Sequence, residues 1–288
     1  MIDRLFLSVG AMKAGTTWLH QQLAGHQDVA FCPEKEIHYF ADPDGNDYMS
    51  LPGRLARYQR VVGNIRAERV NDHVRNNLSW YSSSYLQDKV DDNWYSNLFS
   101  PRHQKRNEAA YCADFSNLYA TLDENGWQHV RRIAKQVRVV YTMRHPSKRL
   151  WSQLKFGYEF GGDAAAVDKL SDSDFRSFLE SPGNFAHADY ASVVERLRCN
   201  LDESEVLFLF FEDFRNEPLG TLRKIERFLD ISPQMYNVEN LKKQVNPTQS
   251  TKAPEAFSDA AGSIHREQVN LLSKLDLQVP ESWYDPAV

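Results

Sequence analysis

Residues 5–17 have the sequence LFLSVGAMKAGTT, and this stretch decides the fold. A short β-favouring run ends at Gly10, and residues 16–23 then carry apolar side chains at helical spacing. A strand, a glycine-containing loop and a helix in this order bring successive backbone N–H groups and the positive end of the helix dipole together. Lys13 adds a positive charge to the loop. The stretch therefore predicts an α/β fold with a site for a phosphate-like anion.

The remainder of the chain repeats the alternation of strand and helix. Further strand signals lie at residues 29–32, 109–113, 137–143 and 206–211, and helical patterns lie at 124–135, 146–159, 185–199, 217–229 and 263–275. This order predicts a mostly parallel central sheet flanked by helices. We expect a single domain over residues 1–288, with a helical, aromatic-rich insert at 44–108 and a surface tail formed by the last dozen residues.

The bulk composition limits the class of protein. A formal net charge of -5 argues against a general nucleic-acid binder, because that role needs a broad basic surface, so any anion site must be local. The three cysteines stand outside any CxxC pattern and predict neither a disulfide framework nor a zinc site. The N-terminal residues lack the pattern of a signal peptide, and no apolar run approaches the roughly 18 residues of a membrane span. We expect a cytoplasmic enzyme.

The loop at residues 10–17 is close to the nucleotide-hydrolase pattern G-x-x-x-x-G-K-[ST], but Lys13 precedes the second glycine. One alternative is an ATP- and magnesium-dependent phosphotransferase or nucleotide hydrolase, for which Asp114 is the one weak candidate as a metal partner. Another is that the loop is only a tight strand-to-helix turn with an exposed lysine.

A second anion site is indicated by residues 137–152, VRVVYTMRHPSKRLWS. Arg144 ends a strand, and Pro146 occupies the favoured first position of the following helix. Ser152 lies on that helix, three residues after Arg149 and therefore beside it. A planar guanidinium and a hydroxyl near a helix start match the donors that a phosphate monoester requires.

Both segments resemble motifs of the sulfotransferases that use 3′-phosphoadenosine 5′-phosphosulfate (PAPS). SVGAMKAGTTWL resembles the 5′-phosphosulfate loop, G-x-x-K-[SA]-G-T-T-x-L, and residues 144–152 resemble the 3′-phosphate motif, R-x-P-x-x-R-x-x-S. The resemblance implies PAPS as donor, the bisphosphate PAP as product and no required metal. It implies that Lys13 contacts the 5′-phosphate and the bridging oxygen. The implied donor-binding residues are Lys13, Ala14, Gly15, Thr16, Thr17, Trp18, Arg144, Ser152 and, from a late loop, Lys252.

The segment PEKEIHYF at residues 33–40 supplies the candidate base. In an extended conformation Glu36 and His38 share one face, where a carboxylate and an imidazole can deprotonate an acceptor hydroxyl. The segment resembles the K-E-x-H-[FY]-F stretch of carbohydrate and heparan-type sulfotransferases, which implies that Glu36 is the base and His38 its partner. Asp42 stands one residue later than the corresponding acid of that branch, and Asp114 replaces the glutamate of its G-E-x-[ST]-P-x-Y segment.

These resemblances imply transfer of a sulfuryl group to a hydroxyl or amine, with Lys13 stabilising the transition state. They also imply a P-loop-like nucleotide-binding core, with the insert at 44–108 on the acceptor side. The expected acceptor is a small molecule, a carbohydrate or a lipid. A non-catalytic module that retains the nucleotide pocket is a further alternative.

Overall fold

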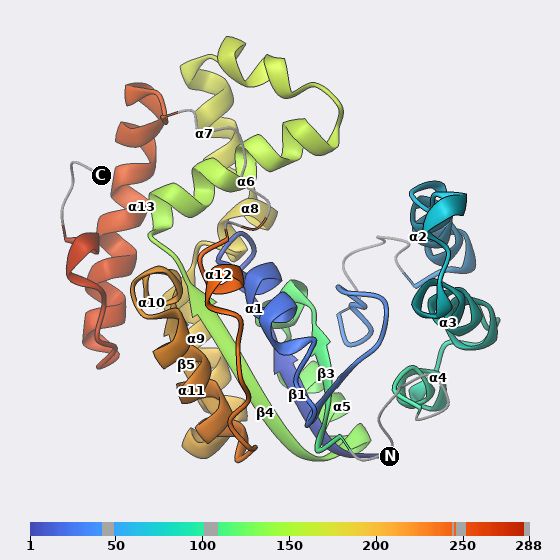
Figure 1. Cartoon of the computed structure of the whole chain (residues 1–288). Helices are drawn as coiled ribbons and strands as arrows, with labels where there is room; N and C mark the ends of the chain where they lie inside the picture. Colours follow the sequence, from blue (N-terminus) through green and yellow to red (C-terminus); the bar gives the residue numbers. More distant parts are fainter. Residues whose placement is uncertain (42–48, 101–108, 244, 246–251, 285–288) are drawn as a thin grey trace.

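The computed structural model describes residues 1–41, 49–100, 109–243, 245 and 252–284 and contains a five-stranded parallel sheet. The strands are β1 (Ile2–Ser8), β2 (Val29–Phe31), β3 (Tyr111–Phe115), β4 (Ala134–Met143) and β5 (Val206–Phe210), in the order β2-β3-β1-β4-β5 (Figure 1). The helices are α1 (Thr16–Leu23), α2 (Leu51–Gly63), α3 (Asp72–Trp80), α4 (Asp92–Asn97), α5 (Glu124–Ile133), α6 (Pro146–Phe160), α7 (Asp172–Glu180), α8 (Pro182–Ala186), α9 (Tyr190–Asn200), α10 (Phe211–Asn216), α11 (Pro218–Leu229), α12 (Val238–Leu241) and α13 (Glu255–Lys274). The predicted α/β class with a parallel sheet is confirmed.

Helices cover both faces of the sheet because the side chains of each buried strand alternate between the faces. In β1, Leu5 and Leu7 belong to a core shared with α5 and α9, whereas Phe6 belongs to a core shared with α1 and α11. All three side chains are fully buried. Because β1 is the third of the five strands in the sheet order, the loop that follows it leaves from the middle of the sheet.

Strand pairing shifts some of the expected boundaries. β4 begins at Ala134, three residues before the predicted strand, because its first residues pair with the start of β1 (Ile2 with Ala134). The helix expected at 124–135 accordingly ends at Ile133. Pairing between neighbouring strands here outweighs local helix propensity.

The described part of the segment 44–108 contains α2, α3 and α4, which lie together beside the sheet (Figure 1). The aromatic side chains of this segment point into the core. Trp80 stacks on Tyr85 with ring centres 5.2 Å apart, and Trp94 donates a hydrogen bond to the Tyr85 carbonyl at 3.2 Å. All three are buried, so they stabilise the fold.

The expectation of a C-terminal surface tail is wrong for the described residues up to 284. Trp283 is fully buried, with its ring centre 5.3 Å from that of Phe210, and its carbonyl lies 2.7 Å from His265 Nε2. Burial of one large aromatic ring is sufficient to fix the segment against the domain. Within the described ranges, no helix combines the length and the apolar character needed to cross a membrane.

Candidate functional site

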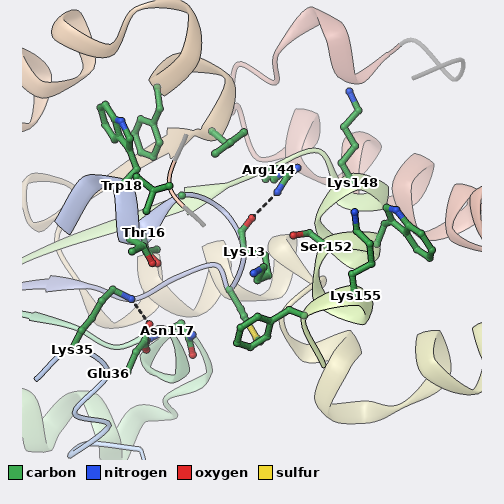
Figure 2. Close-up of a pocket in the computed structure, with 18 of the residues that line it drawn as sticks. Lys13, Thr16, Trp18, Lys35, Glu36, Asn117, Arg144, Lys148, Ser152 and Lys155 are labelled. Carbon is green, nitrogen blue, oxygen red and sulfur yellow. Dashed lines mark hydrogen bonds and ion pairs between the residues drawn. The ribbon is translucent and has the colours of Figure 1, made fainter. Parts of the chain in front are cut away.

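A cavity of about 1280 Å³ lies at the carboxyl ends of β1 and β4, where ligands bind in open α/β sheets. Figure 2 shows Lys13 between two groups of lining residues, with Lys35 and Glu36 on one side and Ser152 and Lys155 of α6 on the other. Among the described lining residues, eleven are lysine or arginine and two are glutamate. The cavity is therefore strongly basic although the chain as a whole carries a net charge of -5.

The loop after β1 turns sharply because three of its residues have positive φ, beginning with Gly10 at 125°. Lys13 has φ 65°, and Gly15, which caps α1, has φ 89°. A Cβ atom at Gly15 would lie 2.8 Å from Phe211 Cδ2, so both the conformation and the packing require glycine. The loop is also fixed to β4, since the Ala11 amide donates to the Thr142 carbonyl at 2.7 Å.

The start of α1 supplies the other loop groups predicted from the sequence. Gly15, Thr16, Thr17 and Trp18 all line the cavity, where the N-terminal amides of a helix attract an anion. The Trp18 ring stacks on Phe214, with ring centres 5.1 Å apart. Ala14 is outside the lining: it is fully buried, and its amide already donates to the Ala11 carbonyl at 3.1 Å.

Arg144 joins the second predicted anion site to the first. Its Nη1 donates a hydrogen bond of 3.1 Å to the carbonyl of Lys13, and its guanidinium lies 4.7 Å from the ring centre of Phe211 (Figure 2). The Tyr190 hydroxyl donates to the Arg144 carbonyl at 2.7 Å. Ser152, on the cavity side of α6, completes this part of the wall. Two motifs 131 residues apart in sequence therefore form one site.

Arg149, the other arginine of the second motif, faces away from the cavity. It is fully buried, and its Nη1 donates to Gln153 Oε1 at 2.6 Å. A charged side chain buried in this way needs such partners. Its Nη2 also donates to the Asn184 carbonyl of α8 at 3.5 Å, which links α6 to α8.

Each cation of this cluster disfavours the protonated form of its neighbours. Burial lowers the pKa of the Lys13 amine, and the nearby Arg144 lowers it further, although Glu159 opposes the shift. Burial also lowers the pKa of Arg144. A bound polyanion would relieve both effects, because an opposite charge favours the protonated form of each group.

Glu36 faces the cavity and has hydrogen-bond partners on several sides. Its Oε1 accepts from Lys35 Nζ at 2.5 Å, and its Oε2 accepts from the Asn117 amide at 2.8 Å. His38 Nε2 lies 3.5 Å from the same Oε2. The Glu36 side chain is 25% exposed, compared with 7% for His38, so the carboxylate is the more accessible of the two groups.

The backbone of this segment is not extended, contrary to the condition on which the shared face was predicted. Glu36 and His38 both have φ 62°. The left-handed conformation is held by hydrogen bonds from the Glu36 amide to the Phe115 carbonyl at 3.0 Å and from the His38 amide to Ser116 Oγ at 3.0 Å. The two side chains still meet, through these turns and not through strand alternation.

Burial lowers the pKa of His38 to about 4, although the neighbouring Glu36 opposes the shift. The imidazole is therefore neutral near neutral pH, where it can orient the Glu36 carboxylate without adding a second charge.

The sequence left the roles of Asp114, Lys252 and Asp42 least defined, and the structure describes the first two. Asp114 is buried outside the cavity lining and accepts hydrogen bonds from Ser116, Tyr95 and Tyr119 at 2.7–2.9 Å, so its oxygens are occupied by hydroxyl donors. Burial raises its pKa to about 6. Lys252 lines the cavity, whereas Asp42 and most of the loop before Lys252 lie outside the described residues.

The structure adds lining residues that sequence reasoning missed: Arg57, Lys148, Lys155, Arg215, Lys242 and Lys243. The sequence contains a pattern that could have identified three of these residues. Lys155 stands one helical turn after Ser152, and Lys242 and Lys243 form an adjacent basic pair. Arg57 had no such signal, since its place depends on how α2 packs. Among the described residues, no cluster of three histidine, cysteine or acidic side chains is suited to a metal ion.

Comparison with known proteins adds a family and a fold. The model of the "Sulfotransferase family" matches residues 6–234. A sulfotransferase from Alicyclobacillus acidocaldarius has a similar structure, with TM-score 0.68, 19% identity and coverage of 99% of this chain and 100% of that one. The sulfotransferase domain of the curacin biosynthetic pathway (TM-score 0.54, 13% identity, coverage 97% and 99%) and that of the Synechococcus PCC 7002 olefin synthase (0.51, 16%, 97% and 96%) are also similar. No curated protein sequence matches the chain.

Proposed function

Since the chain belongs to the sulfotransferase family, we propose that it transfers a sulfuryl group from PAPS to a hydroxyl or amine, with Glu36 as general base and Lys13 stabilising the transition state. The hydrogen bond between Arg144 and the Lys13 carbonyl carries this proposal. It joins two groups of anion-binding residues in one basic cavity, as a donor with phosphates at two positions requires. Glu36 lines the same cavity.

In the proposed reaction, Glu36 accepts the proton of the acceptor hydroxyl while the new bond from oxygen to sulfur forms. The bond from sulfur to the bridging oxygen of the donor breaks, and its electron pair remains on the phosphate of PAP. Lys13 neutralises the charge that develops on that oxygen, and the start of α1 binds the 5′-phosphate. Arg144 and Ser152, with Lys252, bind the 3′-phosphate. The contribution of the protein is positioning and charge stabilisation: the cavity holds the reacting groups in place, and Lys13 acts on the charge that develops in the transition state.

Three observations weigh against the alternatives. Lys13 precedes the second glycine of the loop, and the hydroxyl donors around Asp114 occupy the carboxylate that an ATP- and magnesium-dependent enzyme would need. Against a non-catalytic module, a partly exposed carboxylate, Glu36, lies beside an imidazole, His38, in the lining of the same cavity. We therefore favour catalysis over binding alone.

Calorimetry with PAP tests the donor site. We expect PAP to bind without magnesium, and Arg144→Gln to weaken binding by about tenfold or more, because a hydrogen bond to a charged group contributes roughly 1.5–3 kcal/mol. Lys224→Gln, which removes an exposed charge outside the cavity lining, is the matched control. ATP binding that requires magnesium, with no binding of PAP, would contradict the proposal.

Transfer assays at saturating acceptor test the two catalytic roles. Glu36→Gln and Lys13→Ala should each lower turnover by about 10²-fold or more, the effect of losing a positioned base or charge stabiliser. Near-normal turnover of Glu36→Gln with labelled PAPS would remove Glu36 from the role of base.

A further inference from the structure

Basic residues line the whole cavity, but acidic residues line only one end of it. The part around the two predicted phosphate sites is lined by basic residues and by no acidic one, as far as the described residues extend: Lys13, Arg144, Lys148, Lys155, Arg215, Lys242, Lys243 and Lys252. Both lining glutamates lie at the other end. This asymmetry separates a donor end, which matches a polyanion, from an acceptor end.

At the acceptor end the charges are nearly balanced. Glu36 pairs with Lys35 at 2.5 Å, and Glu34 Oε1 lies 3.5 Å from Arg57 Nη1. Burial raises the pKa of the Glu34 carboxyl, and Arg57 and Arg60 oppose this shift. His38 is neutral near neutral pH. Three cations and two anions therefore leave little charge for an anionic acceptor to neutralise.

The mouth of this end is apolar and lies between α2 and α6. Phe156 and Phe160 stand one helical turn apart on α6, with ring centres separated by 5.9 Å, and both line the cavity. Phe160 is 71% exposed and Phe156 37% exposed. Val61 of α2 and Leu118, next to the Asn117 amide that holds Glu36, extend the same lining. Large exposed apolar side chains around a cavity mark a surface that a ligand covers.

The two helices meet across this mouth. The guanidinium of Arg60 lies 5.8 Å from the ring centre of Phe160. On the inner side, Lys13 Nζ lies 4.2 Å from the ring centre of Phe156. Phe156 thus stands at the junction between the donor and acceptor ends, whereas Phe160 belongs to the acceptor entrance alone.

We infer that the acceptor is an uncharged hydroxyl compound with an apolar body, which covers Phe160, Val61 and Leu118 while its hydroxyl reaches Glu36. This inference rests on the proposed sulfuryl transfer. It separates the chain from enzymes for polyanionic sugars despite the likeness of residues 35–40 to the heparan-type segment. At this end two of the three cations already pair with glutamates, so a polyanion would bring more charge than the end can neutralise.

Initial rates with labelled PAPS test the inference on two series of acceptors: neutral primary alcohols of increasing chain length, and anionic oligosaccharides with free hydroxyls. We expect kcat/KM to rise by up to about fourfold for each added CH2 that packs on the apolar lining. Added salt should leave the KM of the alcohol unchanged, because screening acts only on charged partners. A preference for the anionic series, with a KM that rises with salt, would overturn the inference.

The variant Phe160→Ala tests the apolar surface itself. We expect it to lower kcat/KM for the longest alcohol by about tenfold or more, which is the effect of removing one large apolar contact, and to leave PAP affinity unchanged. Met235→Ala is the matched control, since Met235 is 98% exposed and lies outside the cavity lining. Equal rates for Phe160→Ala and the control would also overturn the inference.

The outcomes separate this inference from the proposed function. Transfer restricted to anionic acceptors refutes the apolar acceptor and leaves sulfuryl transfer intact. Absence of transfer to both series, together with absence of PAP binding, refutes the proposed function and the inference with it.

Discussion

At Gly15 the backbone and the packing require the same residue. With φ 89° and a would-be Cβ only 2.8 Å from Phe211 Cδ2, Gly15→Ala must strain the loop or displace the ring. We expect a loss of roughly 1–3 kcal/mol in the free energy of unfolding, together with weaker PAP binding. Urea unfolding and calorimetry measure the two effects.

The matched control for this prediction is Gly157→Ala in α6. Nothing lies within 4 Å of a Cβ at Gly157, and its backbone is helical. Alanine should therefore stabilise the protein by about 0.5–1 kcal/mol. Equal effects of the two substitutions would show that the conformation of Gly15 is not under constraint.

At the scale of elements, α2 controls the loop that carries the candidate base. Arg57 Nη1 donates to the Glu36 carbonyl at 2.6 Å and also lies near Glu34. Arg57→Met retains the apolar stem but removes the hydrogen bond that helps to hold the left-handed turn at Glu36. We expect kcat to fall by about tenfold or more, since small displacements of a positioned group have large effects on rate.

PAP affinity distinguishes this positioning role from general loss of structure. Arg57 donates hydrogen bonds to Glu36, Glu34 and Tyr85 at the acceptor end. Calorimetry should therefore give an unchanged Kd for Arg57→Met, and Arg57→Lys should recover part of the rate. A Kd that weakens in parallel with kcat would instead indicate that the whole cavity has been disturbed.

At the scale of the whole molecule, buried histidines set the response to acid. Burial lowers the pKa of His38 and His187 to about 4 and that of His145 to about 3. The unfolded chain therefore binds more protons than the folded one between about pH 6.5 and pH 4, so the stabilisation present above pH 6.5 is lost as the pH falls. Asp114 acts in the opposite direction, because its pKa is raised to about 6 and its stabilising effect is lost as the pH rises through that value.

Among the described residues, burial also lowers the pKa of His20 and His265 and raises that of Glu34. Histidines still outnumber carboxyls, so the net effect is a loss of stability in acid. We expect the free energy of unfolding, measured by urea titration, to fall by at least about 1 kcal/mol per pH unit between about pH 6 and pH 5. His145→Gln should flatten this dependence. A free energy of unfolding that stays constant over the same interval would contradict the prediction.

The sequence by itself determined the sheet class and the two anion motifs, because both depend on local patterns. Each motif can be recognised from a few consecutive residues: the glycine loop at residues 10–17, and Arg144 at the end of a strand. It could not place Arg57, whose contact with Glu36 depends on the packing of α2, nor the left-handed turns at Glu36 and His38, which long-range hydrogen bonds hold. It also could not show that the aromatic residues of the insert are buried, and it assigned the C-terminal residues to a tail.

Only the tertiary structure decided those points. Whether Trp80 and Trp283 are buried depends on which elements pack over them, and the balance of charge between the two ends of the cavity depends on side chains from distant segments. Hydrophobic burial and long-range pairing are properties of the assembled chain, whereas turn geometry and strand alternation are properties of short stretches of sequence.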